Sequence, residues 1–161
     1  MKIRTGFGYD VHAFAEGRAL WLGGVQIAYP RGLQGHSDAD VLIHALCDAL
    51  LGAANLGDIG VHFPDTAAEY DGIDSKVLLS KTMEMIRALG YEVGNVDATI
   101  AAEEPKLHPY IPIMQQTLAE TMQVDPDDIS IKATTTEKLG FTGRGEGIAA
   151  CVSVLITELL P

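Results

Sequence analysis

Two histidines and one aspartate have the residue types and the spacing of a metal site. Apolar residues recur at every second position from about residue 2 to 12, which predicts a strand and places Asp10 and His12 on one strand face. His44 lies in a segment with helical spacing, and two imidazoles with one carboxylate are ligands typical of Zn²⁺, Mn²⁺ or Fe²⁺. The alternative is that His44 hydrogen-bonds Asp40 or Asp48 along the surface of its own helix. The spacing alone leaves both interpretations open.

Polar residues also precede the helix that carries His44. We expect this helix to span about residues 38–54, with Ser37 as its N-cap. The Ser37 hydroxyl and the His36 imidazole could hold a phosphate at the helix N-terminus, where free N–H groups and the helix dipole favour anions. The alternative is a solvated N-cap without a ligand, which is the commoner use of such residues.

A third polar segment, residues 132–147, contains consecutive threonines, lysines, an arginine and several glycines. These groups suit phosphate and Mg²⁺, and glycine allows a close approach of the backbone to an anion. The segment is not a Walker loop, because no glycine-rich stretch ends in Gly-Lys-Ser or Gly-Lys-Thr. The alternative is a mobile polar loop.

The long loop predicted for residues 55–72 and the strand exit at 103–107 are weaker candidates. Asp58 and Asp65 are either turn residues or acceptors for the hydroxyls of a polyol. His62 and His108 have no motif around them, so each is interpreted as a surface histidine. No Ser-His-Asp or Cys-His arrangement is evident.

The elements that must position these groups alternate between strands and helices. We predict strands at 2–12, 91–101, 129–134 and 148–158, a Gly-Gly hairpin at 20–27, and helices at about 38–54, 74–90 and 110–122. This order favours one α+β domain over residues 1–161, with helices on one face of a mixed sheet. Gly6 and Gly8 share the strand face of Asp10 and His12, and we expect them to leave room beside those side chains.

Two segments have apolar residues on more faces than we expect a single chain to bury. Residues 94–100 and 148–156 are apolar or small on both strand faces, which predicts a sheet whose second face is covered by other subunits. The helix at 38–54 is apolar nearly all round, which also suggests a subunit interface.

Composition limits the class of partner. The net charge of −11 over 161 residues disfavours nucleic acid and anionic membranes, and a polyphosphate would need cations to bind. No apolar run reaches the roughly eighteen residues of a membrane helix, and no signal core precedes the first strand, so we expect a cytoplasmic protein. Cys47 and Cys151 lie in apolar segments and are interpreted as free buried thiols.

Five sequence blocks together resemble one known family. They are GYDVH at 8–12, GHSDADVLIHA at 35–45, GDIGVHFPD at 57–65, EEPKL at 103–107 and KATTTEKLGFTGRGEG at 132–147. In this order they are similar to the 2-C-methyl-D-erythritol 2,4-cyclodiphosphate synthases, in the monofunctional form. The resemblance implies a lyase of the non-mevalonate isoprenoid pathway. Its substrate would be 4-diphosphocytidyl-2-C-methyl-D-erythritol 2-phosphate, which is cyclised with release of CMP.

The resemblance also implies roles for individual residues. Asp10, His12 and His44 would bind Zn²⁺, and Glu137 would help to hold a Mg²⁺ or Mn²⁺ ion that bridges the diphosphate. His36 and Thr135 would be catalytic. Substrate-binding roles are implied for Asp10, His12, His36, Ser37, Asp58, Ile59, Gly60, Phe63, Pro64, Asp65, Thr66, Ala67, Ala102, Glu103, Glu104, Pro105, Lys106, Leu107, His108, Thr134, Thr135, Thr136, Glu137, Phe141 and Arg144.

The implied assembly is a homotrimer with active sites at the subunit interfaces and the sheets around a threefold axis. An isoprenoid diphosphate could occupy the axial cavity near Arg144 and Glu146. Neither nucleic acid nor a membrane is implied, and the absence of a transit peptide favours the bacterial cytosol over a plastid. Two other hypotheses stay open: a zinc-dependent phosphoester hydrolase, and a trimeric protein that only binds nucleotides or prenyl diphosphates.

Overall fold

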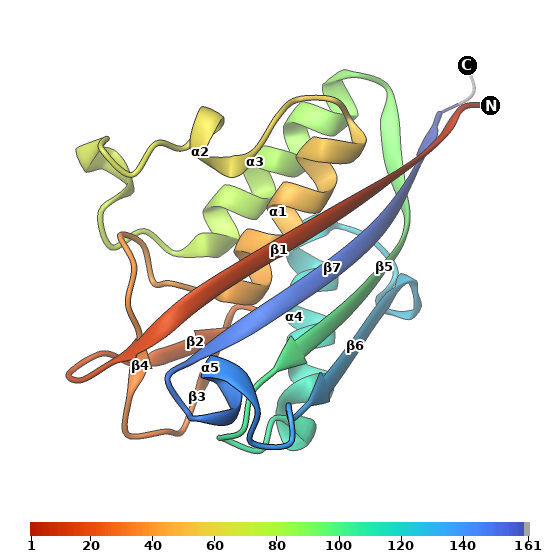
Figure 1. The fold of residues 1–161 in the computed structure, drawn as a ribbon. Helices are drawn as coiled ribbons and strands as arrows, with labels where there is room; N and C mark the ends of the chain where they lie inside the picture. The colour runs from red at the N-terminus through yellow and green to blue at the C-terminus, as the bar shows by residue number, and fades with distance from the viewer. Residues whose placement is uncertain (160–161) are drawn as a thin grey trace.

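The computed structural model describes residues 1–159, which form a mixed sheet with the longer helices on one face (Figure 1). The strands are β1 (Ile3–Ala15), β2 (Leu20–Leu22), β3 (Val25–Ile27), β4 (Gly32–Leu33), β5 (Tyr91–Ala101), β6 (Ile129–Thr134) and β7 (Gly147–Glu158). The helices are α1 (Val41–Ala53), α2 (Ile59–His62), α3 (Ser75–Ala88), α4 (Ile111–Met122) and α5 (Gly140–Gly143), with short 3₁₀ turns at Ala68–Tyr70, His108–Tyr110 and Pro126–Asp128. The predicted fold class is confirmed.

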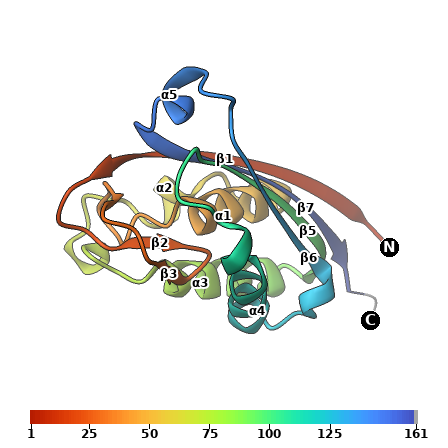
Figure 2. The same ribbon diagram turned by 90° about the horizontal axis from the view of Figure 1, so that it is seen from below.

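The main sheet has the order β4-β1-β7-β5-β6, and the β2-β3 hairpin forms a second, two-stranded sheet. β7 pairs with β1 and β5 in antiparallel fashion, whereas β5 and β6 are parallel. Helices α1, α3 and α4 lie on one side of this sheet, and the single turn α5 projects on the other side (Figure 2). Because β5 and β6 are parallel, their carboxyl ends meet at the same edge, where the 103–107 and 135–147 segments begin.

The contact between β1 and α1 depends on two glycines. A Cβ atom on Gly6 would lie 1.9 Å from the Ala49 carbonyl oxygen, and one on Gly8 would lie 1.9 Å from that of Ala45. The space that we expected beside these glycines is therefore filled by the backbone of α1. This close approach brings His44 on α1 over the strand that carries Asp10 and His12.

Helix α1 is buried over most of its surface inside one chain. It lies between the sheet and α3 (Figure 2), and its buried residues include Leu42, Ile43, Leu46, Leu50 and Leu51. The interpretation of its second apolar side as a subunit interface is therefore wrong. That side packs within the chain, chiefly against α3.

The predicted start of α1 is also wrong. The helix begins at Val41, and its N-cap is Asp40 rather than Ser37. The backbone of Ala39 has a φ of 59°, which interrupts any helix begun at residue 38. The fully buried Asp40 carboxylate accepts hydrogen bonds from the N–H groups of Gly23 at 3.0 Å, Gly24 at 2.7 Å and Ile43 at 3.0 Å. It thereby joins the β2-β3 turn to the start of the helix.

The opposite face of the sheet is open along β1. Ile3, Phe7 and Tyr9 are 55, 65 and 53% exposed there. On the same face β5 contributes the polar residues Asn95 and Asp97, so the expectation of an apolar second face is wrong for β5, and the exposed apolar side chains are concentrated on β1. Within residues 1–159, no helix has both the length and the apolar composition needed to cross a membrane.

Candidate active site

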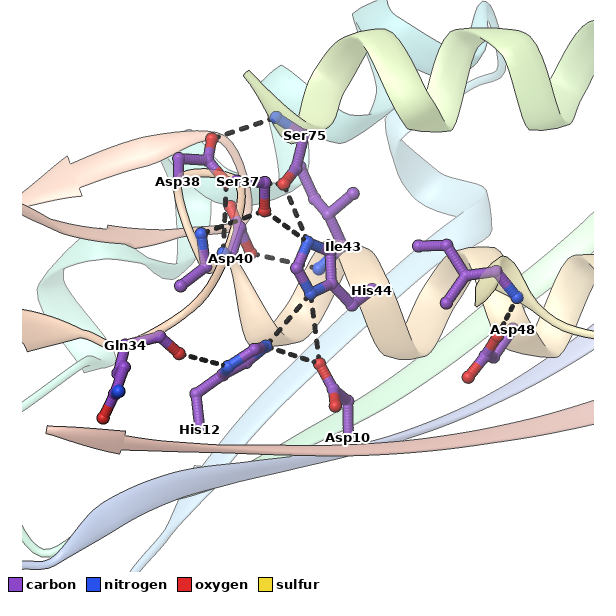
Figure 3. A network of polar contacts seen from close by, with 12 residues as sticks. Asp10, His12, Gln34, Ser37, Asp38, Asp40, Ile43, His44, Asp48 and Ser75 are labelled. Atoms are coloured by element: carbon purple, nitrogen blue, oxygen red, sulfur yellow. Dashed lines mark hydrogen bonds and ion pairs between the residues drawn. The ribbon is translucent and has the colours of Figure 1, made fainter. Parts of the chain in front are cut away.

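Asp10, His12 and His44 converge at the point where β1 passes under α1 (Figure 3). The Asp10 Oδ2 atom lies 3.0 Å from His12 Nε2 and 3.2 Å from His44 Nδ1. The two ring nitrogens are 3.1 Å apart. The three ligand atoms thus surround one point, with two residues from a strand and one from the helix above it.

The other nitrogen of each ring has a partner that sets the tautomer. His12 Nδ1 donates to the Gln34 carbonyl oxygen at 2.6 Å. His44 Nε2 lies 3.1 Å from Ser37 Oγ and 3.0 Å from Ser75 Oγ. When both imidazoles are neutral, these contacts place the protons on His12 Nδ1 and His44 Nε2. The lone pairs of His12 Nε2 and His44 Nδ1 then face each other, and they repel unless a proton or a metal ion lies between them. Two imidazoles and a carboxylate in this arrangement fit a divalent metal ion.

The alternative interpretation of His44 is wrong, because neither Asp40 nor Asp48 hydrogen-bonds its ring. Asp40 is occupied by the backbone N–H groups described above. Asp48 Oδ1 accepts from the Ile59 N–H at 2.7 Å, which fastens α2 to α1.

The charges at the site are mutually stabilised. Burial alone would raise the pKa of Asp10, but hydrogen bonds from His12 and His44 and their positive charge outweigh it and lower the pKa. Burial likewise opposes protonation of His12, but the hydrogen bond and charge of Asp10 and the bond to the Gln34 carbonyl raise the pKa of that imidazole. The lowered pKa keeps Asp10 ionised, as a metal-binding carboxylate must be, whereas a proton on His12 would compete with a metal ion for its nitrogen.

A cavity of about 330 Å³ opens beside the three ligands. Of the residues predicted from the resemblance, His36, Ser37, Ile59, Gly60, Phe63 and Asp65 line it together with the ligands. Tyr70, Ile73 and Leu78 line it as well and had not been predicted. Of the residues predicted in the 58–67 loop, four are not among the lining residues: Asp58, Pro64, Thr66 and Ala67. Asp58 instead caps α2 through the Val61 N–H at 3.1 Å.

His36 and Ser37 occupy the rim of this cavity in different ways. His36 Nε2 lies 3.3 Å from the Ala67 carbonyl oxygen, and its Nδ1 lies 3.7 Å from an Asp71 carboxylate oxygen. Ser37 is only 7% exposed, and its Oγ contacts His44 and the Ala39 N–H. The solvated-cap interpretation of Ser37 is therefore wrong.

A second cavity, of about 350 Å³, lies where β5 and β6 end. It is lined by the predicted residues Ala102, Glu103, Pro105, Lys106, Leu107, His108, Thr134 and Thr135, together with Pro109 and Ala133. His108, which the local sequence suggested was an ordinary surface histidine, thus belongs to a cavity wall. The two cavities have no lining residue in common.

The remaining predicted residues lie outside both cavity walls. Glu104 approaches the Tyr29 hydroxyl at 3.5 Å. Thr136 Oγ lies 2.7 Å from Thr142 Oγ, and Glu137 accepts from Thr135 Oγ at 2.8 Å. Phe141 belongs to α5, and Arg144, just after it, pairs with Glu146 at 2.9 Å on the surface.

Sequence reasoning missed Ser75 and Asp38 as neighbours of the metal site. Ser75 is fully buried, and its hydroxyl donates to Asp38 Oδ1 while it faces His44 Nε2. Asp38 Oδ2 also accepts from the Ser75 N–H at 3.0 Å. The only sequence signal was that Ser75 stands at the start of a helix for which either Asp74 or Ser75 could be the N-cap. Asp74 serves as that cap.

The fold and this site define a member of one protein family. The chain belongs to the YgbB family, whose model matches residues 3–157. Curated relatives named 2-C-methyl-D-erythritol 2,4-cyclodiphosphate synthase are 69% identical in Parabacteroides distasonis, over 99% of both chains, and 67% identical in Bacteroides fragilis, over 99% of this chain and 100% of the relative. The resemblance inferred from the five sequence blocks is therefore confirmed.

Solved structures agree with this assignment. A CDP-bound form of 2C-methyl-D-erythritol-2,4-cyclodiphosphate synthase has a TM-score of 0.88 at 36% identity and covers 96% of this chain and 100% of that one. The bifunctional IspDF of Campylobacter jejuni has a TM-score of 0.95 at 47% identity, over 98% of this chain and 43% of that one. The CDP complex of Plasmodium falciparum IspF has a TM-score of 0.87 at 32% identity and covers 98% of this chain and 97% of that one.

Proposed function

We propose that this chain is a 2-C-methyl-D-erythritol 2,4-cyclodiphosphate synthase. It converts 4-diphosphocytidyl-2-C-methyl-D-erythritol 2-phosphate to the 2,4-cyclodiphosphate and releases CMP. The observation that carries the proposal is the Asp10, His12 and His44 centre beside a cavity, in a chain 69% identical over nearly its full length to a synthase of this name.

The reaction is an intramolecular phosphoryl transfer. An oxygen of the 2-phosphate forms a bond to the β-phosphorus, and the bond from that phosphorus to the oxygen of the α-phosphate breaks, so that CMP leaves with the electron pair. No protein nucleophile takes part. The chain's contribution is to hold a flexible polyanion in a cyclic geometry, and such positioning removes much of the entropic barrier.

Metal ions fit two places in this scheme. Asp10, His12 and His44 would hold Zn²⁺, and Glu137 would help to hold Mg²⁺ or Mn²⁺ at the diphosphate. Bound cations supply charge neutralisation and orientation of phosphate oxygens in an acidic protein. The support for the first place is the pair of facing, unprotonated ring nitrogens.

The remaining roles belong to the walls of the cavities. In the first cavity, His36 and Ser37 bind the phosphate near the reacting centre, and Asp65 accepts hydrogen bonds from the erythritol hydroxyls. In the second, the cytidine is enclosed by Ala102, Lys106, Leu107 and His108, and Thr135 donates to phosphate oxygens as charge develops. The predicted substrate-binding residues that line neither cavity would contact the substrate in the assembled enzyme. They are Asp58, Pro64, Thr66, Ala67, Glu104, Thr136, Phe141 and Arg144.

The assembly is a homotrimer in which the active site lies between neighbouring subunits. Two observations support this: the two cavities have no lining residue in common, and an apolar strand face is open along β1. An isoprenoid diphosphate binds in the axial cavity, near Arg144 and Glu146. The enzyme acts in the bacterial cytoplasm, as the bacterial origin of its relatives supports.

Product analysis tests the proposal. The purified protein is incubated with the diphosphocytidyl substrate and Zn²⁺ and Mg²⁺ in ¹⁸O-labelled water, and the products are identified by mass spectrometry. We expect CMP and the cyclic diphosphate in equal amounts, without ¹⁸O in either product. A linear, labelled product would support a hydrolase instead, and binding without turnover would support a nucleotide-binding protein. The matched control is His44→Ala, which should lose both bound metal and product.

A further inference from the structure

Glu103 lines the second cavity, and its carboxylate also hydrogen-bonds the backbone of the loop that follows β6. One oxygen of its carboxylate, Oε1, accepts from the Thr136 N–H at 3.1 Å and from the Lys138 N–H at 3.0 Å. Glu103 follows β5, and the two donors follow β6, so the contact joins the ends of two parallel strands. The adjacent backbone bond from the Ala102 N–H to the Thr134 carbonyl oxygen, at 3.0 Å, extends the strand pairing to this point.

The loop that Glu103 holds has an unfavourable backbone conformation. Glu137 and Lys138 are consecutive non-glycine residues with φ values of 53° and 65°. Side chains disfavour this left-handed region, and such residues persist only where surrounding contacts impose the conformation. The Gly143 Cα packs so closely against the loop that a Cβ there would lie 2.2 Å from the Lys138 carbonyl carbon. Glu103 supplies hydrogen bonds on either side of Glu137.

The same loop carries groups assigned to the phosphate end of the substrate. Thr135 Oγ donates to Glu137 Oε1 at 2.8 Å, so these two side chains are oriented together. Thr135 and Glu103 both line the second cavity. The Glu103 carboxylate thus lies between the cavity for the nucleotide and the loop that faces the diphosphate.

We propose that Glu103 is a positioning residue that holds the Thr135–Glu137 segment in its reactive geometry. It acts through the two backbone hydrogen bonds rather than through contact with the base or sugar of the nucleotide. The inference rests on the proposed function for its kinetic consequence, whereas the contact with the loop does not depend on which reaction the enzyme catalyses.

The test compares Glu103→Ala with Glu103→Gln. The amide oxygen of glutamine can accept the same two hydrogen bonds, whereas alanine leaves both N–H groups without this acceptor. We expect kcat to fall by about 10-fold or more in Glu103→Ala and to stay within about 3-fold of the wild type in Glu103→Gln. The affinity for CMP, measured by calorimetry, should change by less than about 3-fold in both variants. Glu120→Ala, an exposed change on α4, is the matched control.

A second readout does not require activity. Lys138 is exposed, so trypsin can cut after it once the loop is released. Cleavage at Lys138 should be faster in Glu103→Ala than in the wild type, Glu103→Gln and Glu120→Ala, at equal global stability by urea unfolding.

Three results would overturn the positioning role: a loss of CMP affinity as large as the loss of kcat, a glutamine variant as impaired as alanine, or unchanged cleavage at Lys138. If the wild-type protein formed no cyclic diphosphate, the proposed function would fail, and the proteolysis comparison would still decide whether Glu103 holds the loop.

Discussion

At the scale of single residues, the metal site is defined as much by its hydrogen-bond partners as by its ligands. Ser75 Oγ donates to Asp38, so its lone pair is directed at the Nε2–H of His44. Outer contacts of this kind fix ring orientation and tautomer, and their removal typically weakens metal binding 10- to 100-fold.

We therefore predict that Ser75→Ala lowers the affinity for Zn²⁺ by about 10-fold or more. The change removes one of the two hydroxyls at His44 Nε2 and leaves the Asp74 cap of α3 in place. Competition with a chromogenic chelator measures the affinity directly. Ser80→Ala, on the same helix, is the control and should bind Zn²⁺ like the wild type. Equal affinities in all three proteins would show that Ser37 alone orients the ring.

Cys47 gives a prediction about pH. Burial, with a smaller contribution from Asp48 and Asp40, raises the pKa of this thiol to about 12, although a hydrogen bond with Thr82 opposes the shift. Above about pH 9 the unfolded chain releases this proton while the folded chain retains it, so the thiol lowers the free energy of unfolding as pH rises.

Relative to Cys47→Ala, the wild type should lose up to about 1 kcal/mol of stability per pH unit between pH 9 and 11. Urea unfolding at a series of pH values measures this difference. Cys151→Ala should retain the wild-type slope, because it leaves Cys47 unchanged. A slope in Cys47→Ala that equals that of the wild type would contradict the prediction.

At the scale of elements, the contact between β1 and α1 determines where the ligands meet. Gly8 lets the backbones approach, and a side chain there has no space, because its Cβ would lie 1.9 Å from the Ala45 carbonyl oxygen. Any separation of the two elements would move His44 away from Asp10.

We predict that Gly8→Ala destabilises the protein by about 2–3 kcal/mol and also reduces Zn²⁺ affinity. Gly52→Ala is the matched comparison, since no atom beyond its chain neighbours and the nearby backbone of α1 lies within 4 Å of the position of its Cβ, and the site is an exposed helix position. It should stabilise the protein by about 0.5–1 kcal/mol, because alanine has the higher helix propensity. Chemical denaturation and chelator competition test both variants. Wild-type stability and Zn²⁺ affinity in Gly8→Ala would contradict the close contact between β1 and α1.

At the scale of the whole molecule, the open strand face determines the proposed assembly. Phe7 is 65% exposed in the single chain, and Tyr9, on the same strand face, is 53% exposed. Large apolar side chains that are exposed at neighbouring positions of one strand face are typical of an interface between subunits.

Phe7→Asp should convert a homotrimer into monomers and abolish turnover, because a buried unpaired carboxylate opposes assembly. Sedimentation velocity gives the mass, and Zn²⁺ binding should persist in the monomer because all three ligands come from one chain. Val77→Asp, at a 42% exposed position on α3, should leave the trimer intact. A monomeric wild type that is fully active would contradict the proposed assembly.

Local pattern predicted the regular elements well and their junctions poorly. The alternation of apolar residues placed β5 and β6 at the bounds that the structure has, because side-chain alternation is a local property. The start of α1 was misplaced because the left-handed backbone of Ala39 and the distant N–H groups of Gly23 and Gly24 select Asp40 as the cap. The one-turn helices α2 and α5 escaped notice because four residues carry no periodic signal.

The sequence by itself determined the residue types of the metal site, the family and the order of the elements, because motif and periodicity are contained in neighbouring residues. Only the tertiary structure decided that Ser75 and Asp38 orient His44, that Glu103 holds the loop after β6, and that α1 is buried within one chain. These contacts join residues far apart in the chain, and their geometry depends on how closely whole elements pack. The approach of α1 to Gly6 and Gly8 is the physical reason that the three ligands meet.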